Sequence, residues 1–389
     1  MQKKLFNRYF ILIWLGSLCL LLIQNTMCTV IPLFLQELGF STSFSGLLGI
    51  PFAVFGIAAR ITGGRLMDGF SRRAIMIAGT LLMGIASFLF RLFPVAVLLL
   101  LLRGAHGAGF SLGQAAFSTA SVDVTPREKS SLGVGIFWMS TAVSMACTGY
   151  LIQLLTGDGT YDKVFSACLI FGAAGACFAF FCRYEAPGAG ISPADGQERG
   201  RGPGRFLEPS AAKPALIEFF VMLGVSCCNI FILTFAADQG YQNASVFLLI
   251  SAVSMAASNL SSDRLIQKLG SRNLLALTMA ASGILTALIA LVPCPATYYL
   301  GGIGFGMSQG FSFPVLTILA VDGIPQNRRG TANSTMLMAG DVGMGIGTFL
   351  WGVVIDGSGY SAAYALAGAA LIVSGILSLA FYRGKMPQA

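Results

Sequence analysis

The sequence is poor in charged residues. Only 10% of its 389 residues are Asp, Glu, Lys or Arg, while 55% are hydrophobic. Soluble domains carry about 25% charged residues. A chain with so few charges lacks the polar surface that a water-soluble protein needs, so the composition excludes a soluble globular protein and predicts an integral membrane protein.

Residues typical of catalytic, metal and nucleic-acid sites are scarce or wrongly placed. There is one His, and the nine Cys have neither metal-ligand spacing nor a paired framework, so we expect them to be small buried hydrophobic residues. Gly104 and Gly107 do not form a nucleotide loop, because they lie inside an apolar run with no strand before it. The net charge of +8 is spread over short loops. We therefore expect no enzyme activity, metal, cofactor or nucleic-acid partner.

Apolar runs fill most of the chain. Crossing a bilayer takes roughly 20 mostly apolar residues, and the runs of about that length are 9–30, 44–66, 74–92, 95–121, 131–154, 164–183, 214–237, 244–262, 273–292, 296–320, 331–354 and 361–382. The first run lacks a clear cleavage site, so we expect it to be retained as a span. The polar segment 185–213 is rich in Gly, Pro and Arg and is expected to be a flexible cytoplasmic linker.

These runs predict an all-α membrane protein with twelve transmembrane helices. The linker separates two six-helix bundles, expected at residues 1–184 and 214–389. With both termini and the even-numbered loops on one side of the membrane, that side holds 20 of the 24 Lys and Arg residues. Because basic residues concentrate on the cytoplasmic side, we expect both termini in the cytoplasm.

The two halves of the sequence are related. Residues 65–73 align with 264–272, and residues 122–126 align with 321–325, in both cases 199 positions apart. Each of these segments ends an apolar run or follows one on the expected cytoplasmic side. Two matches at one offset indicate a duplication, and the same order of spans in each half predicts parallel repeats about an axis along the membrane normal.

Two motifs resemble those of one transporter family. The turn after the second run is similar to the signature loop of the major facilitator superfamily, with matches at Gly64, Leu66, Asp68, Arg72 and Arg73. The fourth run carries an Arg-x-x-x-Gly-x-Gly motif like the family's, at Arg103, Gly107 and Gly109. With twelve spans and a central linker, the chain is identified as a member of this superfamily, resembling bacterial drug and metabolite exporters. It lacks the Gly-Pro pair and the first-span Asp that many drug exporters carry.

The resemblance implies alternating access by two rocking bundles. In the family, the charged turn lies beside the cytoplasmic ends of neighbouring helices. Asp68, Arg72 and Arg73 are therefore expected to form a gating network with Asp123, in a motif that also contains Gly64. The other interpretation is that these charges only fix the topology of the chain.

Ionisable side chains inside a bilayer cost about 2.5–3.5 kcal/mol each, so each one is a candidate for a functional site. The candidates are Asp341, His106 and Arg103. Asp341 follows Arg329 by twelve residues, or about 18 Å of helix, and we expect it to be the only carboxylate near mid-membrane. Arg103 and His106 share a helix face because they are three residues apart. For each residue the sequence supports both a role in proton or substrate binding and a purely structural role.

Polar side chains recur at helical spacing around these residues. The further candidates for proton coupling or substrate binding are Gln24, Asn25, Gln114, Asn229 and Gln309. In the family, spans 1, 4, 7 and 10 surround a central cavity, so the resemblance places these side chains where substrate passes. The aromatic and Met residues on the same faces favour substrates that are partly apolar.

We therefore expect a secondary active transporter in a bacterial inner membrane. Its expected function is the export of amphipathic small molecules by proton antiport, with the proton gradient as the energy source. A proton symporter or facilitator for a small metabolite is the alternative, and a membrane receptor or scaffold is the alternative outside transport. The expected partners are the lipid bilayer and a small-molecule substrate, and the chain is expected to be a monomer.

Overall fold

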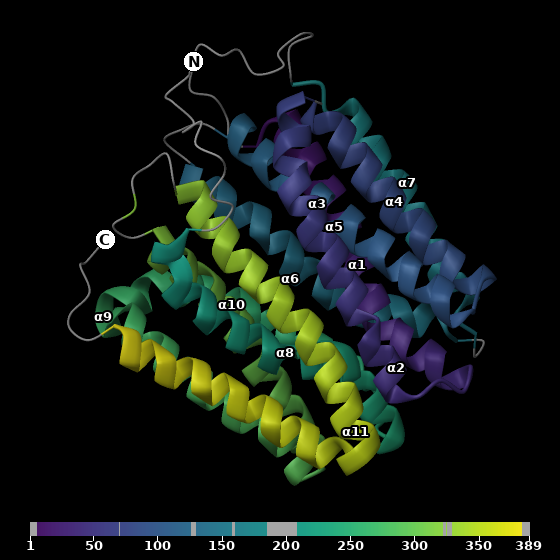
Figure 1. Cartoon of the computed structure of the whole chain (residues 1–389), viewed down its shortest axis with the longest axis vertical. Helices are drawn as coiled ribbons and strands as arrows, with labels where there is room; N and C mark the ends of the chain where they lie inside the picture. Colours follow the sequence, from purple (N-terminus) through teal and green to yellow (C-terminus); the bar gives the residue numbers. More distant parts are fainter. Residues whose placement is uncertain are drawn as a thin grey trace. The chain divides into compact units, whose positions relative to one another are not determined.

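The computed structural model describes residues 6–69, 71–125, 130–157, 160–184, 208–321, 324 and 329–382. Within these residues the regular structure is helical throughout, apart from turns (Figure 1). The α-helices are α1 (Arg8–Glu37), α2 (Thr42–Leu47), α3 (Gly49–Gly69), α4 (Arg72–Leu92), α5 (Ala96–Val124), α6 (Ser130–Leu155), α7 (Asp162–Phe181), α8 (Ala212–Asp238), α9 (Val246–Leu291), α10 (Pro295–Val321) and α11 (Arg329–Phe381). A short 3-10 helix, η3 (Pro209–Ala211), precedes α8.

The two longest helices each contain a reversal at a glycine. Gly270 in α9 has a φ of 76°, and Gly359 in α11 has a φ of 81°. Glycine adopts this left-handed region without the steric cost that a Cβ atom brings. Figure 1 shows α11 turning back at its corner, so that its second, yellow rod leads away at an angle to its first. Each of these helices therefore contains two of the predicted spans.

The predicted spans all fall on helices. Nine segments in the described part of the chain are long and apolar enough to cross a membrane, and one of them, Ala332–Phe381, holds two predicted spans. Val246–Ser262 is a shorter apolar helix, and α6 carries the fifth predicted span. The second predicted span differs in detail, because it is divided at Leu48 into α2 and α3. Pro51 has no N–H group to donate to the carbonyl of residue 47, which weakens the helix at this point.

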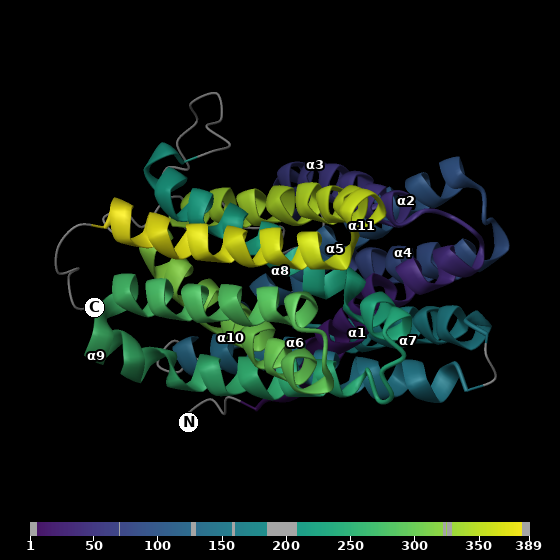
Figure 2. The ribbon, with the colours of Figure 1, turned by 90° about the horizontal axis from the view of Figure 1, so that it is seen from below.

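The chain divides into two compact units. The first consists of Met1–Val30 and Pro51–Asp195, and within it α4 packs against both α5 and α7. The second consists of Ile31–Ile50 and Gly196–Ala389, and within it α8 packs against α11 and α9 against α10 (Figure 2). The second unit thus includes α2, which comes from the first half of the sequence. Residues 185–207 of the predicted linker lie outside the described residues, so the expected domain boundaries stay a prediction.

The helix contacts repeat at the sequence offset of 199. A methyl group on Gly107 would lie 2.2 Å from the carbonyl oxygen of Phe52. A methyl group on Gly306 would lie 2.1 Å from the carbonyl oxygen of Ser251. Both residues of the second pair follow their counterparts by 199 positions. The same close approach of two helices therefore occurs once in each half, as a duplication predicts.

Candidate functional site

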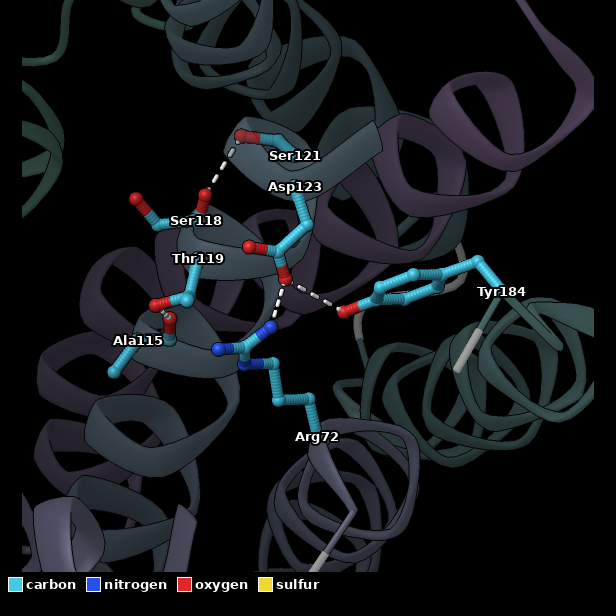
Figure 3. A network of polar contacts seen from close by, with 7 residues as sticks. All are labelled: Arg72, Ala115, Ser118, Thr119, Ser121, Asp123 and Tyr184. Carbon is cyan, nitrogen blue, oxygen red and sulfur yellow. Dashed lines mark hydrogen bonds and ion pairs between the residues drawn. The ribbon is translucent and has the colours of Figure 1, made fainter. Parts of the chain in front are cut away.

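The first part of the candidate site is an ion pair at the ends of α4 and α5. The Ser71 hydroxyl accepts a hydrogen bond from the N–H of Ala74 and caps α4, so Arg72 lies in the first turn of that helix. Arg72 donates to the carboxylate of Asp123, and the Tyr184 hydroxyl donates to the same oxygen at 3.1 Å (Figure 3). Burial raises the pKa of Asp123, and this effect outweighs the opposite effects of Arg72 and Tyr184.

The other residues of the predicted gating motif have different surroundings. The guanidinium carbon of Arg73 lies 4.6 Å from the centroid of the Phe180 ring, which is a cation–π distance. Gly64 and Asp68 belong to α3, but their side-chain surroundings lie outside the described residues. The predicted pairing of Arg72 with Asp123 is thus present in the structure, whereas a role for Asp68 stays a prediction. Tyr184 is an additional partner that the motif did not indicate.

A second group of side chains surrounds His106 in the first unit. The ring is fully buried, and its Nε2 lies 3.1 Å from Oε1 of Gln24. A carboxamide oxygen only accepts hydrogen bonds, so Nε2 carries the proton and donates. Nδ1 then accepts from the Ser87 hydroxyl at 3.4 Å. The neutral form of His106 with the proton on Nε2 therefore satisfies both contacts.

Arg103 joins the same group from one helical turn away. Its Nη2 donates to Sγ of Cys28 at 3.4 Å, and Nε2 of Gln24 donates to the same sulfur at 3.2 Å. The guanidinium carbon lies 4.5 Å from the centroid of the Phe52 ring. We call Gln24, Cys28, Phe52, Arg103 and His106 the arginine cluster. Gln24, Arg103 and His106 are candidates named from the sequence, but Phe52, which comes from α3, is not.

The other polar candidates lie elsewhere. Asn25 donates to the Ser144 hydroxyl at 3.0 Å, linking α1 to α6. Gln114 is 6% exposed, and neither its amide oxygen nor its nitrogen has a hydrogen-bond partner among the described residues. Asn229 on α8 and Gln309 on α10 are both half-buried. Of the five polar candidates named from the sequence, Gln24 is therefore the one that belongs to the arginine cluster.

A pair of carboxylates in the second unit corrects one expectation. Asp341 is not the only acidic residue within the helices there, because Glu218 on α8 is only 2% exposed. A methyl group on Gly340 would lie 3.2 Å from Cγ of Glu218, so Glu218 packs against the residue next to Asp341. Glu218 lies near the start of its apolar run and was missed for that reason. Its position between Ile217 and Phe219 was the available signal.

The cysteines and other potential metal ligands remain separate in the described residues. All nine Cys are free thiols. No group of three or more His, Cys, Asp or Glu side chains in the described part of the chain could hold a metal ion. The ionisable side chains instead form the Arg72–Asp123 pair, the arginine cluster and the Glu218–Asp341 pair. Such groups can bind a charged substrate, hold a proton or link two helices.

Comparison with curated proteins finds relatives that are described as MFS-type transporters. The uncharacterized MFS-type transporters YhhS of Salmonella typhimurium strain LT2 and of Salmonella typhi are 26% identical to this chain over 159 residues. The match covers 41% of this chain and only 39% of each relative. These relatives therefore support the general type of protein and leave its substrate open.

Solved structures of other proteins superimpose on nearly the whole chain. The nucleoside transporter NupG superimposes with a TM-score of 0.73 at 14% identity, covering 97% of this chain and 100% of NupG. The human organic anion transporter MFSD10 superimposes with a TM-score of 0.70 at 15% identity, covering 95% of this chain and 99% of MFSD10. A family model described as the Major Facilitator Superfamily matches residues 13–348 and 214–389. The chain therefore belongs to the Major Facilitator Superfamily and is a multi-pass membrane transporter rather than an enzyme.

Proposed function

We propose that this transporter exports amphipathic small molecules in exchange for protons across a bacterial inner membrane, with both chain termini in the cytoplasm. The observation that carries the proposal is the Glu218–Asp341 pair. Proton-driven transport requires a group that binds a proton in one state of the cycle and releases it in another. A buried carboxyl group beside a half-buried one has the chemistry for this step.

The surroundings of Glu218 favour a proton on one of the two carboxyl groups. Its Oε2 is buried and has no hydrogen-bond partner among the described residues. Two like charges on neighbouring helices in apolar surroundings disfavour each other, so one carboxyl group tends to keep its proton. Lys213, the nearest basic residue along α8, is exposed, and α10 contributes no charged residue to its neighbour α8. We infer that the pair carries one proton and gives it up when its surroundings change.

The arginine cluster supports the choice of an amphipathic substrate. It combines a buried guanidinium group and a carboxamide with the ring of Phe52, and the Phe110 ring lies 6.0 Å from that ring. Polar and aromatic groups on adjacent helix faces suit a molecule with a charged or polar end and an apolar body. The alternative of proton symport of a polar metabolite uses the same groups and is distinguished by the direction of proton movement.

Substitution of the acidic pair tests the proposal. Glu218→Gln and Asp341→Asn remove the exchangeable proton with little change in volume. We expect each variant to lose proton-driven transport by about tenfold or more, while substrate exchange without a gradient continues. Glu37→Gln, at the exposed end of α1, is the matched control and keeps the wild-type rate. Proton-driven transport at the wild-type rate in both Glu218→Gln and Asp341→Asn contradicts the proposal.

A further inference from the structure

The guanidinium group of Arg103 is buried, and no carboxylate among the described residues of its own unit forms an ion pair with it. Its side chain is 5% exposed, and its Nη1 has no hydrogen-bond partner among the described residues. The contacts that it does make are with a thiol and with an aromatic ring. Neither of these groups neutralises a positive charge. A buried cation that lacks an anionic partner is costly, so the position calls for an anion.

In the described residues, the helices up to α5 do not supply this anion. Up to the end of α5 the sequence contains three acidic residues, Glu37, Asp68 and Asp123. Glu37 lies nine residues beyond Cys28 on α1, or about 13 Å of helix, and Asp68 lies about 24 Å along α3 from Phe52. Asp123 lies about 30 Å from Arg103 along α5 and is bonded to Arg72.

The later helices of this unit do not supply it either. The segment of α6 contains no Asp or Glu. Asp162 begins α7, and its carboxylate pairs with Nε of Arg91 at 2.9 Å. The arginine cluster thus has one strong hydrogen-bond donor group, the Nη1 amino group, that is free to take up an anion from outside this unit.

The remaining side chains on this face of α5 indicate which chemical groups the rest of the ligand carries. Arg103, His106, Phe110 and Gln114 follow one another at spacings of three or four residues and so lie along one side of the helix. The Phe52 ring lies next to Arg103 and the Phe110 ring lies 6.0 Å from Phe52, and one turn beyond Phe110 the amide oxygen and nitrogen of Gln114 have no hydrogen-bond partner among the described residues. This order suits a molecule with an acidic group at one end, an apolar body and a polar group further along.

We propose that the substrates of this transporter are amphipathic organic anions, whose acidic group binds to Nη1 of Arg103 and whose apolar body lies against Phe52 and Phe110. The inference rests on the proposed export function and makes its substrate class specific. Arg103 also explains why the site prefers an acid to an uncharged analogue, because an uncharged group leaves the buried guanidinium without a counter-charge.

Binding of matched probes to the purified full chain in lipid nanodiscs tests the inference. The probes are 2-naphthalenesulfonate, octanesulfonate and 2-naphthoate, each paired with its uncharged amide and measured by calorimetry in low-chloride buffer. At least one acid is expected to bind the wild type about tenfold more tightly than its amide. Binding of none of the acids, or equal binding of acid and amide in every pair, overturns the inference. This comparison needs no variant and so does not depend on a variant that folds.

Variants then test whether Arg103 is the residue that binds the acidic group. Arg103→Gln is expected to abolish the preference for the acid, whereas Arg103→Lys keeps the charge and retains part of the preference. Arg91→Gln is the matched control, because it removes an arginine paired with Asp162, and it keeps the wild-type preference. Survival of the full preference in folded Arg103→Gln overturns the inference.

Transport of the same probes separates this inference from the proposed function. Acid-selective binding without proton-linked transport supports the anion site and contradicts the antiport mechanism. Proton-linked export of the uncharged amides, without selective binding of any acid, supports antiport and overturns the anion site.

Discussion

The carboxylate of Asp356 caps the start of α2 by accepting hydrogen bonds from the backbone N–H and the hydroxyl of Ser43. It also accepts from the N–H of Thr42 at 3.2 Å. The first N–H groups of a helix have no partner within the helix, so a carboxylate placed there stabilises it. Close to this contact, a methyl group on Gly46 would lie 2.3 Å from the carbonyl oxygen of Thr348. Residues 31–50 are therefore held to α11 by both hydrogen bonding and close packing.

Removing this cap is expected to destabilise the protein. Asp356→Ala leaves the N–H groups of Thr42 and Ser43 without their acceptor, and the loss of a helix cap typically costs about 1–2 kcal/mol. The measurement is the unfolding temperature in detergent, with Asp238→Ala at the exposed end of α8 as control. The control is expected to match the wild type. Equal unfolding temperatures for Asp356→Ala and the wild type contradict the capping role.

The carboxyl groups of Asp123 and Asp356 are expected to titrate in a definite order. Burial raises the pKa of Asp123 above its ordinary value of 3.8. Burial acts in the same direction on Asp356, but hydrogen bonds from Ser43 and Thr42 outweigh it and lower the pKa. As the pH falls, Asp123 therefore takes up its proton first and loses its ion pair with Arg72. The stability from the Asp356 cap is fully present above the unfolded pKa of about 3.9 and is lost only as the pH falls through the lowered value.

Carbon-13 NMR of the Asp carboxyl groups in nanodiscs measures this order. Asp123→Asn and Asp356→Asn assign the two signals. A titration in which Asp356 becomes protonated at a higher pH than Asp123 contradicts the predicted surroundings of both groups.

The Arg72–Asp123 pair is expected to affect transport more than stability. The two side chains are 25% and 28% exposed, and ion pairs this accessible contribute at most about 1 kcal/mol. Asp123→Arg should therefore slow transport several-fold by placing like charges together, and the exchanged pair Arg72→Asp with Asp123→Arg should recover part of the rate. The same exchange at Arg91 and Asp162 is the control and leaves the rate unchanged. Equal rates for Asp123→Arg and the exchanged pair argue against direct pairing.

The glycines that repeat between the halves predict a paired effect on stability. Gly107→Ala and Gly306→Ala each place a methyl group against a backbone oxygen, and such overpacking costs about 1–3 kcal/mol. Gly357→Ala is the control, because its methyl group would meet nothing within 4 Å. Unfolding temperatures are expected to fall for the first two variants only. A drop in just one of them contradicts the equivalence of the two helix contacts.

Much of the fold could be predicted because it depends on long apolar runs and short charged turns. The helix break at Leu48 was less evident, since the apolar run continues through it. Within the candidate site, helical spacing predicted that Arg103 and His106 share a face. It could not predict Phe52 as a neighbour of Arg103, because this contact depends on how the separate helix α3 is rotated and placed. Glu218 was missed because a single acid near the end of a span resembles a residue at the membrane surface.

Comparing positions 199 residues apart also shows which features differ between the two halves. The close approach of Gly107 recurs at Gly306, whereas the position equivalent to Arg103 is Gly302. In the other direction, the position equivalent to Glu218 in the first half is Cys19. This packing contact thus occurs in both halves, whereas Arg103 and Glu218 each occur in one half only. Under the proposed function, the first half binds the substrate and the second half binds the proton.

The most direct test of the proposed antiport is substrate-induced proton movement in proteoliposomes. The vesicles contain a pH-sensitive dye, start at equal pH on both sides and have their membrane potential clamped. The added compounds are 2-naphthalenesulfonate, its uncharged sulfonamide and an amphipathic quaternary ammonium ion, with protein-free vesicles as control. Antiport predicts that entry of a transported compound drives protons out, so the lumen becomes alkaline, and that Glu218→Gln abolishes this signal. Acidification of the lumen on substrate entry, or transport without any pH change, contradicts proton-coupled export.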